Sequence, residues 1–200
     1  MEGCDLLLRA GRGCHREEIL RLRRDTYCCE LGYGAEAACW TALDDRATQV
    51  VALTRDGQAA AAMRLLGPHD RPFELENNVN LPEFLRSGHP PGEVTRFCIA
   101  AKHRTLRRGL ELQMRLMRFL YDTCRSRGVS DLFICARPSA RKLYEFLLFE
   151  ALTPADIRYG PLQGERHLLM RLEVSSLPSS YALRGHPFRR AFEPVRGFFR

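Results

Sequence analysis

The alternation of apolar and polar positions divides the chain into strand-like and helix-like segments. Short apolar or alternating runs predict strands over 4–10, 48–55, 58–66, 92–100, 131–136, 157–159 and 168–174. Apolar residues at spacings of three and four predict helices over 15–31, 105–127 and 140–149, with a short one near 81–86. This order predicts an α/β fold with a single mixed, mostly antiparallel central sheet flanked by helices.

The central predicted strand, 92–100, carries charges among its apolar residues. Val94, Phe97 and Ile99 suit a buried strand, whereas Glu93 and Arg96 cross it. Burying a charge is costly unless it is paired or hydrogen-bonded. A basic segment then opens the long helix, and helix N-termini bind phosphate. We therefore expect a site that holds a phosphate-bearing cofactor beside an acid/base group.

Composition indicates one globular domain of 200 residues, with 45% hydrophobic and 28% charged residues. We expect a domain over 1–174 and a tail over 175–200, where serine, proline, arginine and phenylalanine dominate. Since no apolar run is long enough to span a bilayer and no signal-peptide layout appears, we expect a cytoplasmic protein. The basic-aromatic tail either touches an anionic membrane or an acidic protein, or is disordered or packs back.

The net charge and the cysteine spacing indicate which binding partners and metals are expected. The net charge of +7 favours acidic or phosphorylated partners, and the absence of a nucleic-acid-binding signature argues against DNA or RNA. The eight cysteines show no zinc spacing and the six histidines show no ligand spacing, so we assign no metal.

Four short motifs stand out in the chain: Arg23-x-x-x-Tyr27, Gly32-Tyr33, Arg64-Leu65-Leu66 and, most specifically, Glu93-Val94-Thr95-Arg96-Phe97. With the order of the predicted elements, they resemble the GNAT (N-acetyltransferase-like) superfamily, in the branch of acyl-homoserine-lactone (autoinducer) synthases and long-chain N-acyl amino acid synthases. The likeness extends over about residues 5–174.

Two departures from the branch pattern affect the expected substrates. Tyr33 replaces a tryptophan, and only one of the adjacent acids Asp44 and Asp45 aligns; we prefer Asp45. The acetyl-CoA loop of the wider superfamily lacks its second glycine in the segment 104–110. The branch that uses acyl carrier protein often shows such a loop, which favours acyl carrier protein over acetyl-CoA.

The resemblance implies roles for the residues that match. Glu93 would accept the amine proton, directly or through water, or it would pair with Arg96; both can hold at once. Tyr144 would protonate the leaving thiol, or it is a packing residue. Backbone N–H groups near 97–100 would form the oxyanion hole. The implied catalytic residues are Glu93, Thr95, Arg96 and Tyr144.

The same resemblance implies two binding sets, for which ordinary core or surface roles are the alternative. The set for the acceptor pocket is Arg23, Tyr27, Tyr33, Trp40, Asp45, Arg64 and Phe97. The set for the pantetheine arm and its phosphate is Cys98, Ile99, Ala100, Lys102, Arg104, Arg107, Arg108 and Gly109. The basic members of the second set either meet the phosphate or form a solvated face.

The resemblance predicts an N-acyltransferase that moves a fatty acyl group to the amine of a small amino-acid-type acceptor. The co-substrate would be the acyl-phosphopantetheine of acyl carrier protein, or acyl-CoA, with no tightly bound cofactor. The first alternative is an acyl-homoserine-lactone synthase that uses S-adenosylmethionine and serves quorum sensing. The second, from another class, is a non-catalytic GNAT-like binding module.

Overall fold

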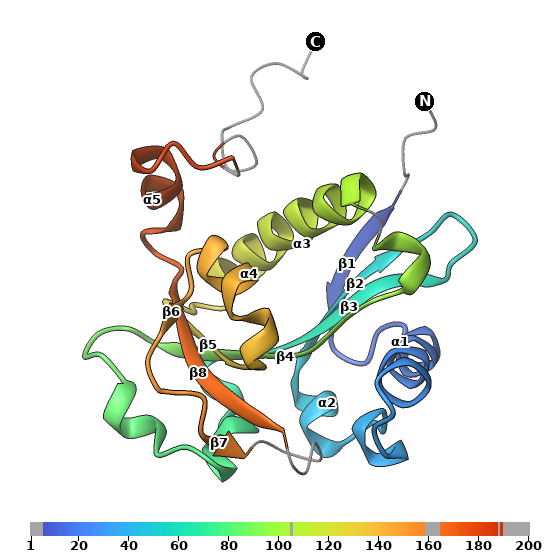
Figure 1. Ribbon diagram of the computed structural model, residues 1–200, viewed down its shortest axis with the longest axis horizontal. Coiled ribbons are helices and arrows are strands. Elements are labelled where there is room, and N and C mark those ends of the chain that lie inside the picture. Colours follow the sequence, from blue (N-terminus) through green and yellow to red (C-terminus); the bar gives the residue numbers. More distant parts are fainter. Residues whose placement is uncertain (1–5, 105, 159–164, 188, 190–200) are drawn as a thin grey trace.

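One eight-stranded sheet organises the protein (Figure 1). The computed structural model describes residues 6–104, 106–158, 165–187 and 189. The strand order is β1-β2-β3-β4-β5-β8-β6, and β7 pairs with β8 beside this path. The strands are β1 (Leu7–Gly11), β2 (Thr48–Leu53), β3 (Ala59–Leu66), β4 (Pro91–Ile99), β5 (Asp131–Ala136), β6 (Glu150–Ala151), β7 (Ile157–Arg158) and β8 (Arg166–Glu173).

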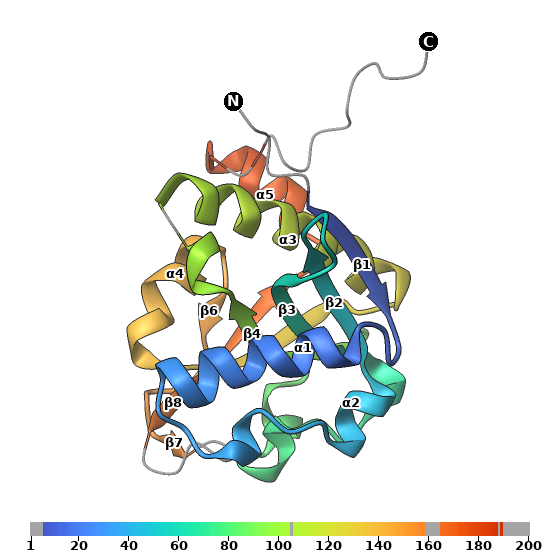
Figure 2. The ribbon, with the colours of Figure 1, turned by 90° about the vertical axis from the view of Figure 1, so that its right-hand side faces the viewer.

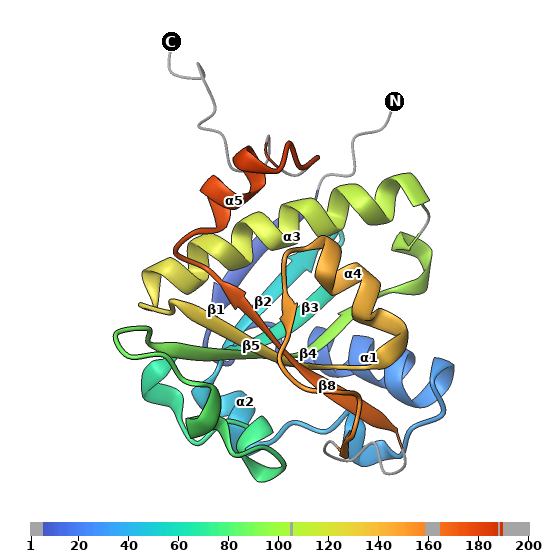
Figure 3. The same cartoon turned by 60° about the vertical axis from the view of Figure 1, so that its left-hand side comes forward.

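Helices cover both faces of this sheet. Figure 3 shows α3, α4 and α5 on the near face and α1 and α2 behind it, and Figure 2 shows α1 running across the second face. The α-helices are α1 (Arg16–Arg23), α2 (Ala42–Arg46), α3 (Leu106–Ser126), α4 (Arg141–Phe146) and α5 (Leu177–Leu183). A π-helix, η1 (Arg24–Glu30), continues α1. The 3-10 helices are η2 (Ala35–Ala37), η3 (Pro68–Asp70), η4 (Leu75–Asn77), η5 (Leu81–Phe84), η6 (Ala101–His103) and η7 (Pro138–Ala140).

The sheet opens between its two parallel strands. Strands β4 and β5 pair from Pro91↔Asp131 to Glu93↔Phe133 and then stop pairing, although β4 continues to Ile99 and β5 to Ala136. The other neighbours in the sheet pair antiparallel. The ends of β4 and β5 therefore diverge in the middle of the sheet.

A β-bulge in β4 coincides with this divergence. Thr95 pairs with Arg64 and Cys98 pairs with Ala62, so that Arg96 and Phe97 together face the single residue between those partners. Arg96 has a φ of 56°, in the left-handed region. For a residue other than glycine this conformation costs of the order of 1–3 kcal/mol, so surrounding contacts must hold it.

Apolar side chains on both faces of the sheet bury the strands. The largest cluster lies between the sheet and α3, where Leu112, Leu116 and Leu120 pack inward. A smaller cluster under α1 contains Ile19 and Leu22. Strand β4 contributes to both clusters, with Ile99 in the first and Cys98 in the second, so its end has buried side chains on both faces of the sheet.

The predicted fold class is confirmed, with several local differences. The helix predicted over 15–31 turns into η1 after Arg23, the helix near 81–86 is the 3-10 helix η5, and β6 was not predicted. The last residue of the strand predicted over 157–159 lies outside the described residues. No helix in the described part of the chain combines the length and the apolar character that crossing a membrane requires.

The predicted tail begins too early. Helix α5 packs on the domain, since Tyr181 is fully buried in the largest cluster and its hydroxyl donates to the Leu147 carbonyl at 3.1 Å. His186 likewise contacts the Phe146 carbonyl at 2.7 Å. The segment 177–187 therefore belongs to the fold. The tail residues 188 and 190–200, on which the membrane prediction depends, lie outside the described residues.

Candidate active site

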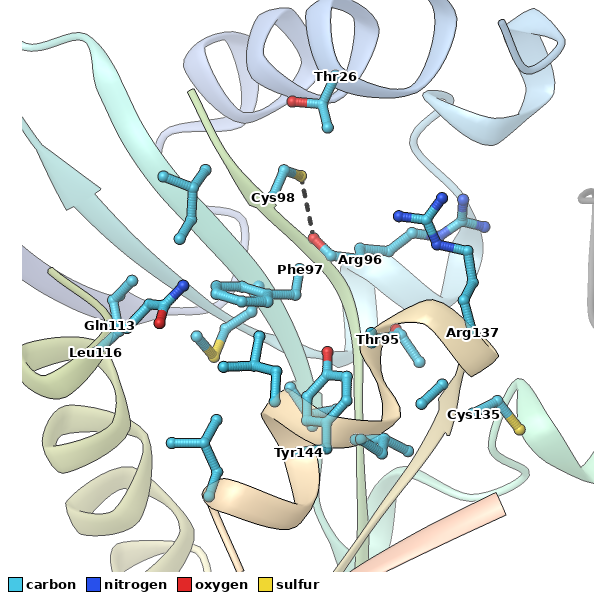
Figure 4. A pocket seen from close by; sticks show the side chains of 18 of the residues that line it. Thr26, Thr95, Arg96, Phe97, Cys98, Gln113, Leu116, Cys135, Arg137 and Tyr144 are labelled. Carbon is cyan, nitrogen blue, oxygen red and sulfur yellow. Dashed lines mark hydrogen bonds between the residues drawn. The ribbon is translucent and has the colours of Figure 1, made fainter. Parts of the chain in front are cut away.

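A cavity of about 460 Å³ lies where β4 and β5 diverge (Figure 4). This volume is in the range of small-molecule sites. Residues from both faces of the sheet line it, since Tyr144 comes from the face covered by α4 and Arg96 from the opposite side of β4. The cavity thus connects the two faces through the opening in the sheet.

The end of the cavity between the sheet and α3 and α4 is apolar. Phe97 of β4 and Leu116 of α3 line this end, and Gln113 is the polar residue of α3 there (Figure 4). Such a surface favours an aliphatic chain, because burying it removes apolar area from water. The apolar lining residues of this end include Met63, Val94, Phe97, Leu116, Met117, Leu120, Ile134, Leu143, Leu147 and Phe149.

The other end of the cavity is polar. It brings together an acid, two guanidinium groups, a phenol and a buried imidazole from parts of the chain that lie far apart in sequence. Burial lowers the pKa of the His167 imidazole, which is therefore neutral at pH 7. The polar lining residues of this end are Tyr33, Glu74, Thr95, Arg96, Arg137 and His167.

Alternating acidic and basic side chains form a chain of salt bridges that ends at Arg96, in the polar end of the cavity. The Asp44 carboxylate accepts hydrogen bonds from Arg23 at 2.7 Å and from Arg64 at 3.3 Å. The Glu74 carboxylate pairs with the same Arg64 and, at 2.8 Å, with Arg96. Arg23 and Arg64 are fully buried. Burial opposes ionisation of Asp44, but the hydrogen bond and charge of Arg23 and the charge of Arg64 outweigh it and lower its pKa.

This chain of charges also holds the bulge in β4. Arg64 Nε donates to the Thr95 hydroxyl at 3.0 Å, and Arg96 donates to Glu74 and to the Ala37 carbonyl. These contacts lie on both sides of the left-handed Arg96 and offset the cost of its backbone conformation. The predicted residues Arg23 and Arg64 therefore act beneath the cavity, while Thr95 and Arg96 line it.

Glu93 does not line the cavity. Its side chain is fully buried, and its two carboxylate oxygens accept the backbone N–H groups of Glu74 at 2.7 Å and Leu75 at 3.0 Å. This contact is the reason why Glu74, and not Glu93, is the carboxylate that reaches the cavity. Direct transfer of the amine proton to Glu93 is thus not what the structure shows, whereas transfer through water stays a prediction; Glu93 positions the turn that carries Glu74.

The π-helix η1 forms one edge of the cavity through Thr26 and Tyr27. The Tyr27 hydroxyl donates to the Phe97 carbonyl at 3.4 Å, and the Cys98 thiol donates to the Arg96 carbonyl at 3.2 Å (Figure 4). Burial raises the pKa of Cys98 to about 11, so its thiol is protonated at neutral pH. Cys98 thus contributes a hydrogen bond to the bulge.

Tyr144 lies at the junction of the two ends. Figure 4 shows its hydroxyl pointing from α4 into the cavity toward β4. Its ring packs edge-on against Phe149, with centroids 5.5 Å apart. Burial raises the pKa of Tyr144 to about 12, with the charge of Arg137 acting in the opposite direction, so the phenol keeps its proton at neutral pH.

The basic segment that precedes α3 lies at the mouth of the cavity. Arg104 lines the cavity, donates from Nε to the Ile99 carbonyl at 2.6 Å and pairs with Glu30 of η1 at 2.5 Å. Lys102 is exposed and donates to Gln58 at 3.0 Å. Ile99 also lines the cavity, whereas Ala100 does not. The side chains at the start of α3, including Arg107, Arg108 and Gly109, lie outside the described residues.

Two predicted acceptor residues lie away from the cavity. Trp40 packs against Arg23, 5.6 Å from its guanidinium carbon, and donates to Asp45 at 2.7 Å. Asp44, not Asp45, joins the charge chain, because Asp44 is the N3 residue of α2 and turns inward to cap Thr41. The preference for Asp45 is therefore corrected to Asp44.

Several lining residues were not predicted. Thr26, Gln113 and Cys135 showed no distinguishing sequence signal, but Arg137 directly follows an apolar strand, a place where functional side chains often emerge. Glu74 comes from an irregular excursion and is held at the cavity by long-range contacts, with Glu93 through its backbone and with Arg64 and Arg96 through its side chain.

Comparison with solved structures places the fold among acyltransferases. FeeM, an N-acyl amino acid synthase from uncultured soil microbes, aligns with a TM-score of 0.71 at 16% identity, over 90% of this chain and 96% of its own. The acyl-homoserine-lactone synthase LasI aligns with 0.64 at 16% identity, over 92% and 97% of the two chains. BjaI, a CoA-dependent acyl-homoserine-lactone synthase, aligns with 0.64 at 14% identity, over 91% and 90%. At these identities, the likeness shows the fold alone.

Sequence comparison identifies the family. No curated protein matches the chain. The family model described as N-acyl amino acid synthase FeeM matches residues 18–173, most of the chain, including every described residue that lines the cavity. The chain therefore belongs to the FeeM family of N-acyl amino acid synthases and is an acyltransferase.

Proposed function

We propose that this acyltransferase moves a fatty acyl group from acyl carrier protein to the amine of a free amino acid, in the cavity between β4 and β5. The observation that carries the proposal is the division of one continuous cavity into an apolar and a polar end. An acyl chain fits the first end and an amino acid fits the second. The thioester carbonyl would then lie at the opening in the sheet, beside the bulge.

The reaction forms one C–N bond and breaks one C–S bond. The amine attacks the thioester carbon, the tetrahedral oxyanion needs hydrogen-bond donors, and the thiolate leaves with a proton. Beyond Glu93, β4 has no strand partner on its β5 side among the described residues. Successive N–H groups of a strand point to opposite sides, and that of Ala100 is directed to β3, so we infer that the N–H groups of Phe97 and Ile99 face the oxyanion.

The amine end needs a group that accepts its proton. Glu74 lines the polar end and contacts Arg64 and Arg96 there, so its carboxylate is suited to orienting an ammonium group. The neutral imidazole of His167 lines the same end and is suited to receiving the proton. In this arrangement Glu93 acts on the amine only through its contact with the backbone of Glu74.

Tyr144 is suited to protonating the leaving thiolate. A phenol with a pKa of about 12 keeps its proton at neutral pH and can donate it. It reaches the cavity from α4, on the same side of the sheet as the acyl chain. The thiolate leaves from this side, because the pantetheine arm enters past η6 and the head of α3.

The donor is acyl carrier protein rather than CoA in this proposal. The net charge of +7 suits an acidic carrier protein, and Arg104, which lines the cavity, follows the exposed Lys102 by two residues. The test is turnover of one fatty acyl chain carried by acyl carrier protein or by CoA. We expect kcat/KM for the carrier protein to be at least tenfold higher and to fall steeply with ionic strength. Equal or better use of acyl-CoA would reverse the assignment.

An acyl-homoserine-lactone synthase is the second candidate, because LasI and BjaI share the fold. The two functions differ in their acceptor and product. Turnover with a mixture of amino acids and S-adenosylmethionine, followed by mass spectrometry, separates an open acyl amino acid from an acyl lactone. Membership in a family of synthases argues against the third candidate, a non-catalytic binding module.

A further inference from the structure

Among the described side chains, three arginines line the cavity, and they differ in how their charge is compensated. Arg96 pairs with Glu74 at 2.8 Å, and Arg104 pairs with Glu30 at 2.5 Å. Arg137 has no carboxylate partner within salt-bridge distance in the described part of the chain. Its contact there is with the hydroxyl of Tyr33, at 3.2 Å from Nη1. Arg137 is thus the cavity arginine that is ready to receive an anion.

The contact with Tyr33 orients Arg137 without neutralising it. The Tyr33 hydroxyl accepts from Arg137 and donates its own hydrogen to the Glu165 carboxylate at 2.8 Å. A neutral phenol therefore separates the guanidinium of Arg137 from the Glu165 carboxylate. A guanidinium carries five N–H donors in a planar fork that matches a carboxylate, and the described protein contact uses Nη1 alone.

The position of Arg137 suits the acceptor rather than the donor. Arg137 follows β5 directly, and the last residues of β5, Ile134 to Ala136, form the wall opposite the bulge in β4. Figure 4 shows Arg137 on the same side of the cavity as Arg96, away from Gln113 and Leu116 of the apolar end. An anion at Arg137 therefore lies near the reacting carbonyl but outside the acyl-chain end.

We propose that Arg137 binds the α-carboxylate of the acceptor and thereby selects free α-amino acids over amines that lack a carboxylate. This proposal rests on the proposed function of the cavity. In an α-amino acid the amine and the carboxylate sit on one carbon, so a carboxylate held at Arg137 brings the amine to the same polar end, where Glu74 is available to orient it.

The test compares each amino acid with its decarboxylated amine. The pairs are leucine with 3-methylbutylamine and phenylalanine with 2-phenylethylamine, measured in wild-type protein, Arg137→Gln and Arg141→Gln. Arg141 is the matched control, because it is exposed, pairs with Glu145 and does not line the cavity. We expect Arg137→Gln to raise KM for the amino acids about tenfold to a hundredfold, with a smaller change in kcat. The constants for the amines should stay unchanged, as should every constant of Arg141→Gln.

Binding without an acyl donor separates this proposal from the proposed function. Ligand-observed NMR with the same pairs should show binding of the amino acid that is lost in Arg137→Gln, whether or not turnover occurs. Absence of any acylated product would overturn the proposed function while this measurement still decides the role of Arg137. Two results would overturn that role: wild-type protein that binds the amine as well as the amino acid, or Arg137→Gln protein that keeps the preference.

Discussion

The substitution Glu93→Gln separates a positioning role from a general-base role for this glutamate. Its carboxylate accepts two backbone N–H groups, those of Glu74 and Leu75, at 2.7 and 3.0 Å in a fully buried setting. Glutamine has one carbonyl oxygen and one amide nitrogen, so it can accept from only one of these groups. The other backbone N–H would then face an amide that is itself a donor.

The loss of stability expected for Glu93→Gln follows from these two hydrogen bonds. A hydrogen bond to a charged group contributes about 1.5–3 kcal/mol, and a buried donor left unsatisfied costs about 1–3 kcal/mol. We therefore expect Glu93→Gln to lower the free energy of unfolding by about 3 kcal/mol. In a chain of this size, that corresponds to a fall of about 6–12 °C in Tm.

The assay is urea unfolding together with the pH–rate profile. The matched control is Glu76→Gln in the same segment, where the partly exposed carboxylate accepts one backbone N–H, from Phe73, and pairs with Arg71. Since glutamine can keep the bond from Phe73, we expect a loss of only about 1 kcal/mol. A Glu93→Gln protein as stable as wild type, but at least a hundredfold slower and without its acid limb, would refute the positioning role and restore the general base.

Three further substitutions probe other parts of the account. Asp44→Asn should lower the free energy of unfolding, measured in urea, by about 3–5 kcal/mol, and Asp45→Asn by less than about 0.5 kcal/mol. Because the pKa of Asp44 is lowered in the folded protein, Asp44 contributes stability above its unfolded pKa and loses it as pH falls through the folded pKa. The stability of Asp44→Asn should therefore depend less on acid pH than that of the wild-type protein. Tyr144→Phe should lower kcat about a hundredfold at unchanged KM, and the wild-type rate should show no alkaline fall from this phenol below about pH 10. Tyr181→Ala should lower stability by about 3–5 kcal/mol, whereas an extended tail would tolerate it.

The sequence was informative where apolar periodicity decides the structure. Strand β5 was predicted with its observed bounds, and α3 to within one residue at either end. In both segments the spacing of the apolar residues fits one type of secondary structure, in which those residues are buried together. Helix α5 was not predicted, although Leu177 and Tyr181 are spaced by one helical turn, because the serine, proline, arginine and phenylalanine content of 175–200 indicates a tail. Their burial depends on contacts with α4 and the sheet, far away in sequence.

Two errors at the site have different physical origins. The choice between Asp44 and Asp45 was decidable, since Thr41 and Asp44 have capping-box spacing and such a cap turns Asp44 inward. The role of Glu93 could not be predicted from the sequence, because it depends on which backbone N–H groups the fold brings to its carboxylate. The left-handed backbone of Arg96 is likewise a product of the register between β3 and β4.

The most direct test of the account asks whether the acyl chain occupies the apolar end of the cavity. Leu116→Phe adds bulk to a lining residue of α3, and Leu112→Phe makes the same change one turn earlier, in the core but outside the cavity lining. The measurement is kcat/KM over a series of acyl carrier proteins of increasing chain length. The account predicts that Leu116→Phe shifts the preferred chain to a shorter one, while Leu112→Phe keeps the wild-type preference. An unchanged preference in Leu116→Phe, or equal shifts in both variants, would contradict it.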